Sequence, residues 1–121
     1  MIARHIARGA AAEALAARYL ESQGLAVIGR NLRCRVGEID LVCLHADVLV
    51  IVEVRLRARA DFGGALASVS RLKRRRLLRA TQYHWQRRPE WRTRRLRFDV
   101  IGVQGTTPAR VTWIRDAFRA I

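Results

Sequence analysis

The sequence predicts an α/β protein with a mixed sheet, in the element order α-β-β-β-α-β-β, and three observations support this fold class. Apolar residues recur at helical spacing in two segments, one near the N-terminus and one past the middle of the chain. The other apolar segments are short, rich in β-branched residues and bounded by turn-forming residues, as strands are. The chain has 121 residues, half of them apolar, and no repeat or linker, so residues 1–121 are expected to form one domain.

The first helix is expected from about Arg8 to Gln23, because Gly24 is a residue type common just beyond a helix end. Its apolar stripe consists of Ala12, Leu15, Ala16, Tyr19 and Leu20. The chain from Leu25 through Arg35 is then expected to form the first strand.

Residues 37–56, GEIDLVCLHADVLVIVEVRL, are expected to form a β-hairpin, because they are rich in Val, Ile and Leu and break only around Ala46. A two-residue and a four-residue loop give the same register, which places Asp40 opposite Glu53. The register also places Glu38 opposite Arg55, so that all four side chains share one face at the open end of the hairpin. The other face is expected to be apolar and to pack against a helix: Ile39, Leu41, Cys43, Val48, Val50, Val52 and Val54.

The second half of the chain is expected to hold one more helix and two strands. A flexible loop is predicted at Asp61–Gly64. Ser70 is the expected N-cap of the arginine-rich helix, Ser68 is an earlier alternative, and the helix should end before Pro89. The last two strands are predicted around residues 98–101 and 111–114, joined by a turn at residues 105–108.

The pairing of Asp40 with Glu53 is the first indication of a functional site. Cross-strand neighbours have Cβ atoms about 4.5–5.5 Å apart, and like charges directly opposite each other destabilise a sheet. A divalent cation would relieve the repulsion, and Mg²⁺ binds carboxylates, waters and substrate phosphate oxygens. The arrangement therefore suggests phosphodiester hydrolysis with Mg²⁺ or Mn²⁺. The structural alternative is a salt bridge between Glu38 and Arg55, with the other two carboxylates in solvent.

The same spacing resembles the PD-(D/E)XK nuclease motif, in which an Asp on one strand is followed by Glu-x-Lys on the next. The matching positions are Asp40, Glu53 and Arg55. From about residue 9 to Phe118 the chain is similar to the bacterial YraN family, small uncharacterised proteins with an endonuclease-like fold related to Holliday junction resolvases. The segments that carry this resemblance are Ala11-Ala12-Glu13, Ala17-Arg18-Tyr19-Leu20, Arg30-Asn31, Gly37-Glu38-Ile39-Asp40, Phe62-Gly63, Lys73-Arg74-Arg75 and Arg97-Phe98-Asp99-Val100.

This resemblance implies a restriction-endonuclease-like PD-(D/E)XK core with a metal-dependent endonuclease site. Asp40 and Glu53 would then be catalytic residues and metal ligands, with Glu38 as an auxiliary ligand. The related resolvases place a glutamate on their first helix beside the metal, and Glu13 borders the apolar stripe of the first helix here. The alternative for Glu13 is an exposed side chain paired with a nearby arginine.

One position departs from the motif, because Arg55 stands where the motif has a lysine that positions or deprotonates the attacking water. Arginine can stabilise charge on a phosphoryl group but cannot act as a base, since its pKa stays above about 12. Lys73 is the only lysine among 24 basic residues, and helical spacing places it in the middle of an inward arc. We therefore expect Arg55 or Lys73 to be the catalytic cation. Alternatively, the Lys73 stem covers the core and its ammonium is in water.

The chain is strongly basic, with a net charge of +14 at pH 7. The segment from Arg55 to Arg97 holds 15 of the 24 basic residues and only two acidic ones. Guanidinium groups suit contacts with phosphates, and the aromatic residues between them can stack on unpaired bases. The predicted nucleic-acid-binding residues are Arg57, Arg71, Lys73, Arg74, Arg75 and Arg79. The alternative is a solvated helix face in a chain that simply favours arginine.

Other protein classes are not expected from this sequence. It has no run of about 18 apolar residues and no hydrophobic core of a signal peptide, so no membrane span is expected and a cytoplasmic location is predicted. Cys34 and Cys43 lack the spacing of a zinc pair and are interpreted as reduced structural thiols. His5, His45 and His84 match no catalytic triad or metal motif.

Three functions remain open at this stage. The first is a metal-dependent endonuclease. The second is a nuclease-fold protein that binds nucleic acid, expected to be DNA, without cleaving it, since Arg55 replaces the lysine. The third is an assembly protein whose basic face docks an acidic partner; salt-sensitive binding to DNA but not to acidic polypeptides would argue against it. A homodimer is expected by analogy with two-fold resolvases, and Asp99 is expected to be structural, paired with Arg97.

Overall fold

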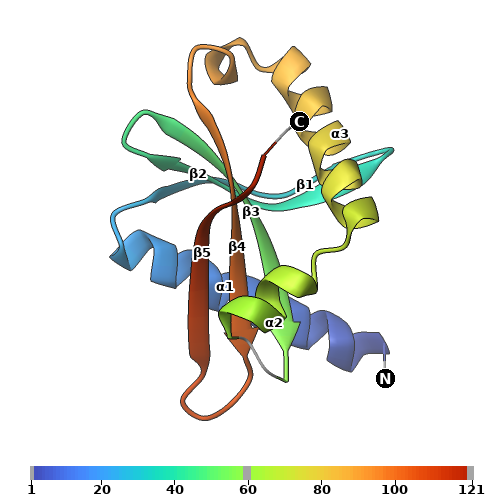
Figure 1. Ribbon diagram of the computed structural model, residues 1–121, viewed down its shortest axis with the longest axis vertical. Helices are drawn as coiled ribbons and strands as arrows, with labels where there is room; N and C mark the ends of the chain where they lie inside the picture. The colour runs from blue at the N-terminus through green and yellow to red at the C-terminus, as the bar shows by residue number, and fades with distance from the viewer. Residues whose placement is uncertain (1, 59–60, 120–121) are drawn as a thin grey trace.

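The computed structural model describes residues 2–58 and 61–119, with side chains for residues 9–58, 61 and 63–119 (Figure 1). In chain order the elements are α1 (Ile2–Ser22), β1 (Ala26–Cys34), β2 (Gly37–His45), β3 (Val48–Arg57), α2 (Phe62–Ala67), α3 (Arg71–Arg87), the 3₁₀ turn η1 (Pro89–Trp91), β4 (Leu96–Gln104) and β5 (Arg110–Phe118). Every predicted helix and strand is present, so the mixed α/β fold class is confirmed. The helix α2 and the turn η1 were not predicted.

The five strands form one sheet in sequential order, β1-β2-β3-β4-β5. Neighbouring strands are antiparallel except for β3 and β4, which run parallel. A parallel pair needs a long crossover connection, and α2, α3 and η1 provide it here. This connection carries the arginine-rich helix α3 across one face of the sheet (Figure 1).

Helices cover both faces of the sheet, and each face has its own apolar core. The core beneath α1 includes Ala12, Ala16, Ala17, Leu20, Leu41, Cys43, Val50 and Val52. The core beneath α2 and α3 includes Ile39, Val42, Leu49, Ile51, Ala65, Val69, Leu77, Ala80 and Val100. Burial on both faces explains why β2 and β3 are almost continuously apolar in sequence.

The ends of α1 differ slightly from the prediction. The helix begins at Ile2, earlier than the expected Arg8, and ends at Ser22, one position before Gln23. The chain leaves it at Gly24, which has a φ of +93°, a conformation that glycine adopts without strain. The predicted C-terminal signal is therefore confirmed.

The connection between β3 and α3 corrects one prediction and confirms another. The segment expected as a flexible loop starts α2, because the Asp61 carboxylate accepts a hydrogen bond from the Gly64 backbone N–H at 2.6 Å and caps the helix. Ser70 caps α3 as predicted, since its hydroxyl accepts from the Lys73 backbone N–H at 3.2 Å. Ser68, the alternative start, is instead the C-terminal cap of α2.

The hairpin of β2 and β3 has the predicted register, with Leu41 opposite Val52. The predicted apolar face is only part of its buried surface, because Val42 and Ile51 on the other face are fully buried as well. The placement of Ile39 on the predicted face was wrong, since it packs with Val42 and Ile51. The helix α3 covers them, so polar side chains on that face are confined to the open end of the hairpin.

Asp99 on β4 is fully buried and structural, as predicted. Both of its oxygens accept hydrogen bonds from the Arg97 guanidinium at 2.9 Å. The Trp113 indole N–H and the Asp116 backbone N–H also donate to it, each at 2.9 Å. These contacts tie β4 to β5 where the ladder between the two strands shifts register.

The cysteines and histidines have structural surroundings. Cys34 and Cys43 are free thiols, and burial raises the pKa of Cys43 to about 12. His45 contacts the Arg97 guanidinium, and His84 is buried with a pKa lowered mainly by that burial. The side chain of His5 lies outside the described residues.

Candidate functional site

The site forms where the side-chain alternation of β2 breaks. Ile39 packs in the core beneath α3, whereas Leu41 packs in the core beneath α1. Residues two apart in a regular strand face the same side, so the break lies at Asp40. On β1, Asn31 lies between the two residues that pair with Ile39 and Leu41. It has a φ of +50°, a left-handed conformation that Asn tolerates better than most residues. This paired irregularity brings the Asp40 carboxylate to the side where α1 carries Glu13.

Four carboxylates converge at this break. One oxygen from each of Glu13, Glu38 and Asp40 lies within 4.8 Å of the others. Glu53 on β3 is close enough to Asp40 for each carboxyl group to shift the pKa of the other. The Asp40 Oδ2 also accepts a hydrogen bond from the Val54 backbone N–H at 2.8 Å, which fixes the carboxylate against β3. We call these four residues the carboxylate cluster, with Asp40 at its centre.

Burial and mutual repulsion raise the pKa values of Asp40, Glu53 and Glu13. The pKa of Asp40 is raised to about 8, mainly by desolvation and then by the charge of Glu53. Desolvation is also the main cause of the raised pKa values of Glu13 and Glu53, and the charge of Asp40 adds to it for Glu13. The cluster therefore retains protons near neutral pH, and a bound cation would displace them.

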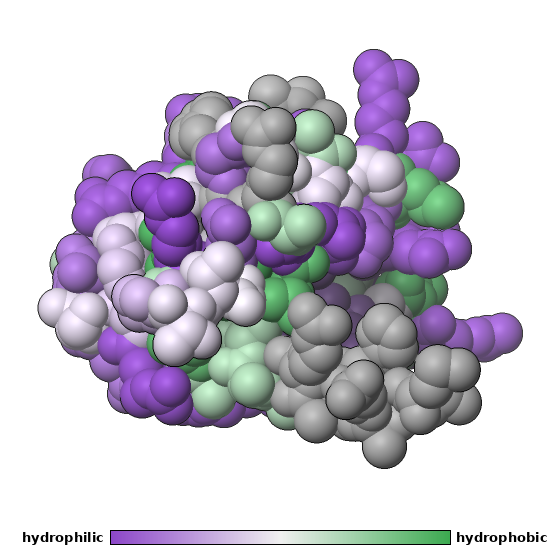
Figure 2. All heavy atoms as spheres, turned by 90° about the horizontal axis from the view of Figure 1, so that it is seen from below, coloured by the Kyte–Doolittle hydropathy of each residue, from purple (hydrophilic) through white to green (hydrophobic). Residues whose placement is uncertain are grey.

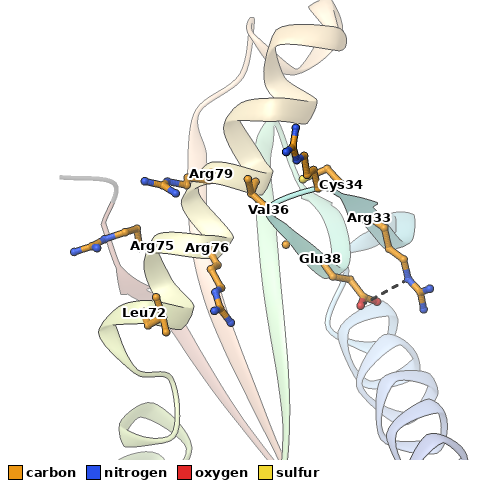
Figure 3. A pocket seen from close by; sticks show the side chains of 10 residues that line it. Arg33, Cys34, Val36, Glu38, Leu72, Arg75, Arg76 and Arg79 are labelled. Atoms are coloured by element: carbon orange, nitrogen blue, oxygen red, sulfur yellow. Dashed lines mark ion pairs between the residues drawn. The ribbon is translucent and has the colours of Figure 1, made fainter.

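Arg55 is anchored to α2, and among the described residues it forms no ion pair with a carboxylate. Its Nε donates to the Ser68 Oγ at 3.0 Å, and the Ser68 hydroxyl donates to the Ala65 carbonyl at 2.7 Å. Glu38 pairs instead with Arg33, at 3.8 Å (Figure 3). The predicted alternative of a salt bridge between Glu38 and Arg55 is therefore wrong. Within residues 2–58 and 61–119, no acceptor is bonded to the two Nη nitrogens of Arg55, so they are available to an anion.

Lys73 is exposed, although its position on the helix was predicted correctly. It lies four residues before Leu77, on the same stripe as the residues of α3 that are buried: Leu77, Ala80, Thr81 and His84. The first turn of α3 is not covered, so the lysine at that end of the stripe stays in solvent. Its charge nevertheless lowers the pKa of Glu53, against the larger effect of desolvation. The ammonium group is thus close enough to act on the carboxylate cluster. Leu72, expected on the same inward arc, is 52% exposed.

A groove of about 780 Å³ lies between α3 and the β1–β2 hairpin, and we call it the hairpin groove (Figure 3). Its lining residues are Arg33, Cys34, Arg35, Val36, Gly37, Glu38, Leu72, Arg75, Arg76 and Arg79. Gly37 allows the hairpin to approach the helix closely, because a Cβ at this position would lie 3.1 Å from the Arg76 carbonyl oxygen. Glu38 belongs both to this groove and to the carboxylate cluster, so the two features adjoin.

The predicted nucleic-acid-binding arginines lie in three places. Arg75 and Arg79 line the hairpin groove. Arg71 and Arg74 line a second hollow of about 620 Å³, together with Arg75 and the end of β5, and we call it the β5 hollow. Arg57 lines a separate hollow with residues of the β4–β5 loop, and so lies apart from the other two surfaces.

Four residues around the site were not predicted from the sequence. The Asn31 side chain lowers the pKa of Glu13, against the larger effect of burial, and its occurrence in one of the segments shared with the YraN family was the available signal. Ser68 was considered only as a helix cap. Arg33 and Arg76 line the hairpin groove, but in a chain with so many arginines no local pattern distinguishes them.

The donor set of the carboxylate cluster fits a hard divalent cation. It offers only carboxylate oxygens, which are the ligand type that Mg²⁺ and Mn²⁺ prefer. Glu13, Asp40 and Glu53 have raised pKa values even though the chain carries a net charge of +14, so the surrounding arginines do not offset the burial and mutual repulsion of these carboxylates. A cation held by Asp40 and its neighbours would do so.

Comparison with known proteins places the chain in a family. A model of the "Uncharacterised protein family UPF0102" matches residues 12–103, a range that contains the carboxylate cluster, Arg55, Lys73 and the hairpin groove. The chain belongs to the UPF0102 family. The resemblance to YraN proteins is thereby confirmed at the level of the family, and the family description names no activity.

Relatives within UPF0102 match nearly the whole chain. A UPF0102 protein of Pseudomonas putida (strain GB-1) is 46% identical over 112 residues, 91% of each chain. One from Pseudomonas aeruginosa (strain LESB58) is 45% identical over 116 residues, 93% of each chain. One from Alcanivorax borkumensis is 46% identical over 112 residues, 91% of this chain and 90% of its own. Of the helices in the described part of this UPF0102 chain, none has the length and apolarity needed to cross a membrane.

Proposed function

We propose that this protein is a metal-dependent endonuclease that hydrolyses phosphodiester bonds in nucleic acid. The observation that carries this proposal is the carboxylate cluster, in which oxygens of Glu13, Glu38 and Asp40 lie within 4.8 Å of one another, beside an arginine-lined groove. A nucleic acid strand needs a cationic groove, and hydrolysis of a phosphodiester needs neutralisation of the reacting phosphate. Glu38 links the two features.

In this proposal the four carboxylates hold the cation, which is Mg²⁺ or Mn²⁺. Asp40 and Glu53 are the main ligands, and Glu13 and Glu38 complete the set. When bound, such an ion supplies an activated water and neutralises charge on the phosphate. The chain positions and tunes the ligands: the Val54 N–H fixes Asp40, and the Asn31 side chain favours the charged form of Glu13.

Arg55 and Lys73 provide the remaining positive charge in the proposed mechanism. Ser68 holds the Arg55 guanidinium through Nε, so that its Nη groups can donate to phosphoryl oxygens. Lys73 lies near Glu53 at the start of α3 and stabilises negative charge there. Because arginine cannot accept a proton, the general base in this proposal is a carboxylate of the cluster.

We further infer that the fold is of the restriction-endonuclease-like PD-(D/E)XK kind. Support comes from the mixed sheet covered by helices on both faces, with Asp40 on β2 and both Glu53 and Arg55 on the neighbouring β3. These are the strand positions at which the motif carries its three residues.

A second candidate function is binding of nucleic acid, expected to be DNA, without cleavage. Arg55 favours it, because the side chain that stands in place of the motif lysine cannot deprotonate water. The arginine-lined grooves would then serve binding alone. The predicted homodimer stays a prediction under either function.

Cleavage of a labelled panel of single-stranded, duplex, flapped and four-way-junction DNA, with Mg²⁺ or Mn²⁺ and with EDTA, tests the proposal. The informative variants are Glu53→Ala, which removes a ligand, and Arg55→Lys, which restores the motif residue. Asp47→Asn is the matched control, because it removes an exposed carboxylate at the opposite end of the same hairpin.

Cutting that requires the metal, that Glu53→Ala abolishes and that Asp47→Asn leaves intact is the expected result. Binding without cutting by the native chain, with cleavage restored in Arg55→Lys, would establish the second candidate instead. Neither binding nor cutting of any member of the panel would contradict both.

A further inference from the structure

We propose that α3 inserts into the major groove of a DNA duplex, with one strand of the duplex in the hairpin groove and the other in the β5 hollow. The inference rests on the proposed function only in taking nucleic acid as the partner. It concerns binding, so it stands or fails independently of whether the protein cleaves.

The first support is that arginine-lined hollows lie on both sides of α3. The hairpin groove receives arginines from the β1–β2 hairpin and from α3. The β5 hollow on the other side is lined by Arg71, Arg74, Arg75, Leu78, Ala117, Phe118 and Arg119. Arg75 lines both, which makes the helix a ridge between them. Figure 3 shows Arg75 and Arg79 extending away from the hairpin, whereas Arg76 lies on the hairpin side of the helix.

Two arginines of the β5 hollow, Arg74 and Arg119, are held in place. Arg74 donates through Nε to the Val69 carbonyl at 3.1 Å, and its guanidinium lies 5.1 Å from the centre of the Phe118 ring. Arg119 pairs with Asp116 at 2.8 Å. Fixed guanidinium groups lose less conformational entropy than mobile ones when they bind a phosphate. This hollow is therefore suited to hold a DNA phosphate at a defined position.

The second support is the exposed crest of α3. Arg75, Arg79, Gln82 and Gln86 are all exposed, and their spacing of four, three and four residues places them on one stripe. Arginine pairs with the major-groove edge of guanine, and glutamine pairs with that of adenine. The crest therefore carries side chains that read base edges, and the flanks carry side chains that bind phosphates.

The dimensions agree with this arrangement. An α-helix with its side chains is about 10–12 Å wide, and the major groove of B-form DNA is about 12 Å wide and 8.5 Å deep. The deep, narrow major groove of an A-form RNA duplex does not admit a helix. A single strand would use one hollow and leave the other without a function. The observations thus favour duplex DNA, with the strand in the hairpin groove passing Glu38 of the carboxylate cluster.

Fluorescence anisotropy in EDTA tests this inference with a duplex DNA, an RNA duplex of the same sequence and a single DNA strand. Arg35→Ala/Arg76→Ala removes two charges from the hairpin groove, and Arg71→Ala/Arg119→Ala removes two from the β5 hollow. Arg18→Ala/Arg110→Ala, at exposed positions on α1 and at the start of β5, is the control for the same loss of net charge.

The hairpin-groove variant and the β5-hollow variant are each expected to bind duplex DNA at least tenfold more weakly than the control near 0.1 M salt. Each should also reduce the magnitude of the slope of log affinity against log salt by about 2. The β5-hollow variant should bind the single strand as the control does. The RNA duplex should bind at least tenfold more weakly than the DNA duplex. A duplex with bulky substituents at cytosine C5, which fill the major groove, should also bind poorly.

Three results would overturn the inference. They are duplex binding by Arg71→Ala/Arg119→Ala equal to the control, equal affinity for the RNA and DNA duplexes, and full affinity for the duplex with a filled major groove. Since the assay contains EDTA and measures binding alone, a failure of the proposed cleavage activity would leave its result unchanged.

Discussion

The Nε of Arg55 lies 3.0 Å from the Oγ of Ser68, thirteen residues further along the chain. This hydrogen bond joins β3 to the end of α2 and fixes the guanidinium there, and in the described part of the chain no acceptor is bonded to its Nη groups. A lysine at position 55 has a single nitrogen and could not bind Ser68 and a phosphate in the same way. The side chain that departs from the nuclease motif is therefore specifically positioned by a residue outside that motif.

Ser68→Ala is expected to lower the rate of phosphodiester cleavage about tenfold, because the guanidinium loses its anchor and its preorganisation. Ser68→Thr keeps the hydroxyl and should retain most of the activity. Steady-state kinetics on the best substrate of the panel measures both, and the loss should fall mainly on kcat.

The hydrogen bond between Arg55 and Ser68 also predicts that the effects of mutating the two residues are not additive in a double-mutant cycle. In an Arg55→Ala background, Ser68→Ala should have no further effect on kcat, because the two side chains act as one unit. Equal effects of Ser68→Ala with and without Arg55 would show that the serine matters only for the stability of α2.

Asp40 makes the stability of the metal-free protein depend on pH. Its pKa is raised from 3.8 to about 8 by burial and by Glu53. The folded state therefore holds a proton that the unfolded state has lost between these two pH values, and stability falls as pH rises through this window. Asp40→Asn should weaken the dependence, leaving the smaller part that comes from Glu13 and Glu53, and raise the free energy of unfolding at pH 8 by about 1–2 kcal/mol, a few degrees in Tm.

Thermal unfolding in EDTA between pH 5 and pH 9 measures this effect. Asp47→Asn, on an exposed turn, is the control and should keep the native pH profile. The account would be contradicted by a native protein that becomes more stable from pH 5 to pH 8, or by an Asp40→Asn variant that is less stable than the native protein. Either result would show that the protein itself stabilises the negative charge of Asp40 without a bound cation.

Asn31 combines a backbone role with an effect on the charge state of Glu13, and two substitutions separate them. Asn31→Gly keeps the φ of +50° without strain but loses the polar side chain that favours the charged form of Glu13, so Mn²⁺ affinity should fall about tenfold with little change in stability. Asn31→Val should in addition destabilise the fold by about 1–2 kcal/mol. Isothermal titration calorimetry and urea unfolding measure the two effects. Unchanged Mn²⁺ affinity in both variants would exclude the effect on Glu13.

Asp99 provides the contrast of a buried carboxylate without a catalytic role. Asp99→Ala leaves Arg97 and Trp113 without their acceptor and should cost about 3–5 kcal/mol of folding free energy. The milder Asp99→Asn should cost less and leave the Mn²⁺ affinity unchanged. A loss of Mn²⁺ affinity in a folded Asp99→Asn protein would extend the metal site to β4.

The local patterns of the sequence were sufficient for much of the fold. The hairpin register follows from the period of two and the turn around Ala46, and the end of α1 follows from Gly24. The helix α2 was missed because its sequence, FGGALA, contains two glycines of low helix propensity. It forms because Asp61 caps it and Ala65 packs in the core, and neither contact is visible in a local pattern.

The site was only partly predictable, for reasons that are not local. Asp40 and Glu53 were identified because their pairing follows from the register. The convergence with Glu13 depends on the irregularity at Asn31, on a different strand. The helical phase of Lys73 was predictable, but its exposure depends on how much of α3 the sheet covers.

Calorimetric titration of Mn²⁺ into the protein at pH 7, in two buffers with different heats of ionisation, tests the central claim most directly. The native chain should bind the ion and release about one proton, because Asp40 holds a proton near this pH in the absence of the ion. Asp40→Asn should abolish both the binding and the proton release, whereas Asp47→Asn should leave both intact. Equal Mn²⁺ affinity in the native protein and Asp40→Asn would contradict the assignment of the carboxylate cluster as a metal site.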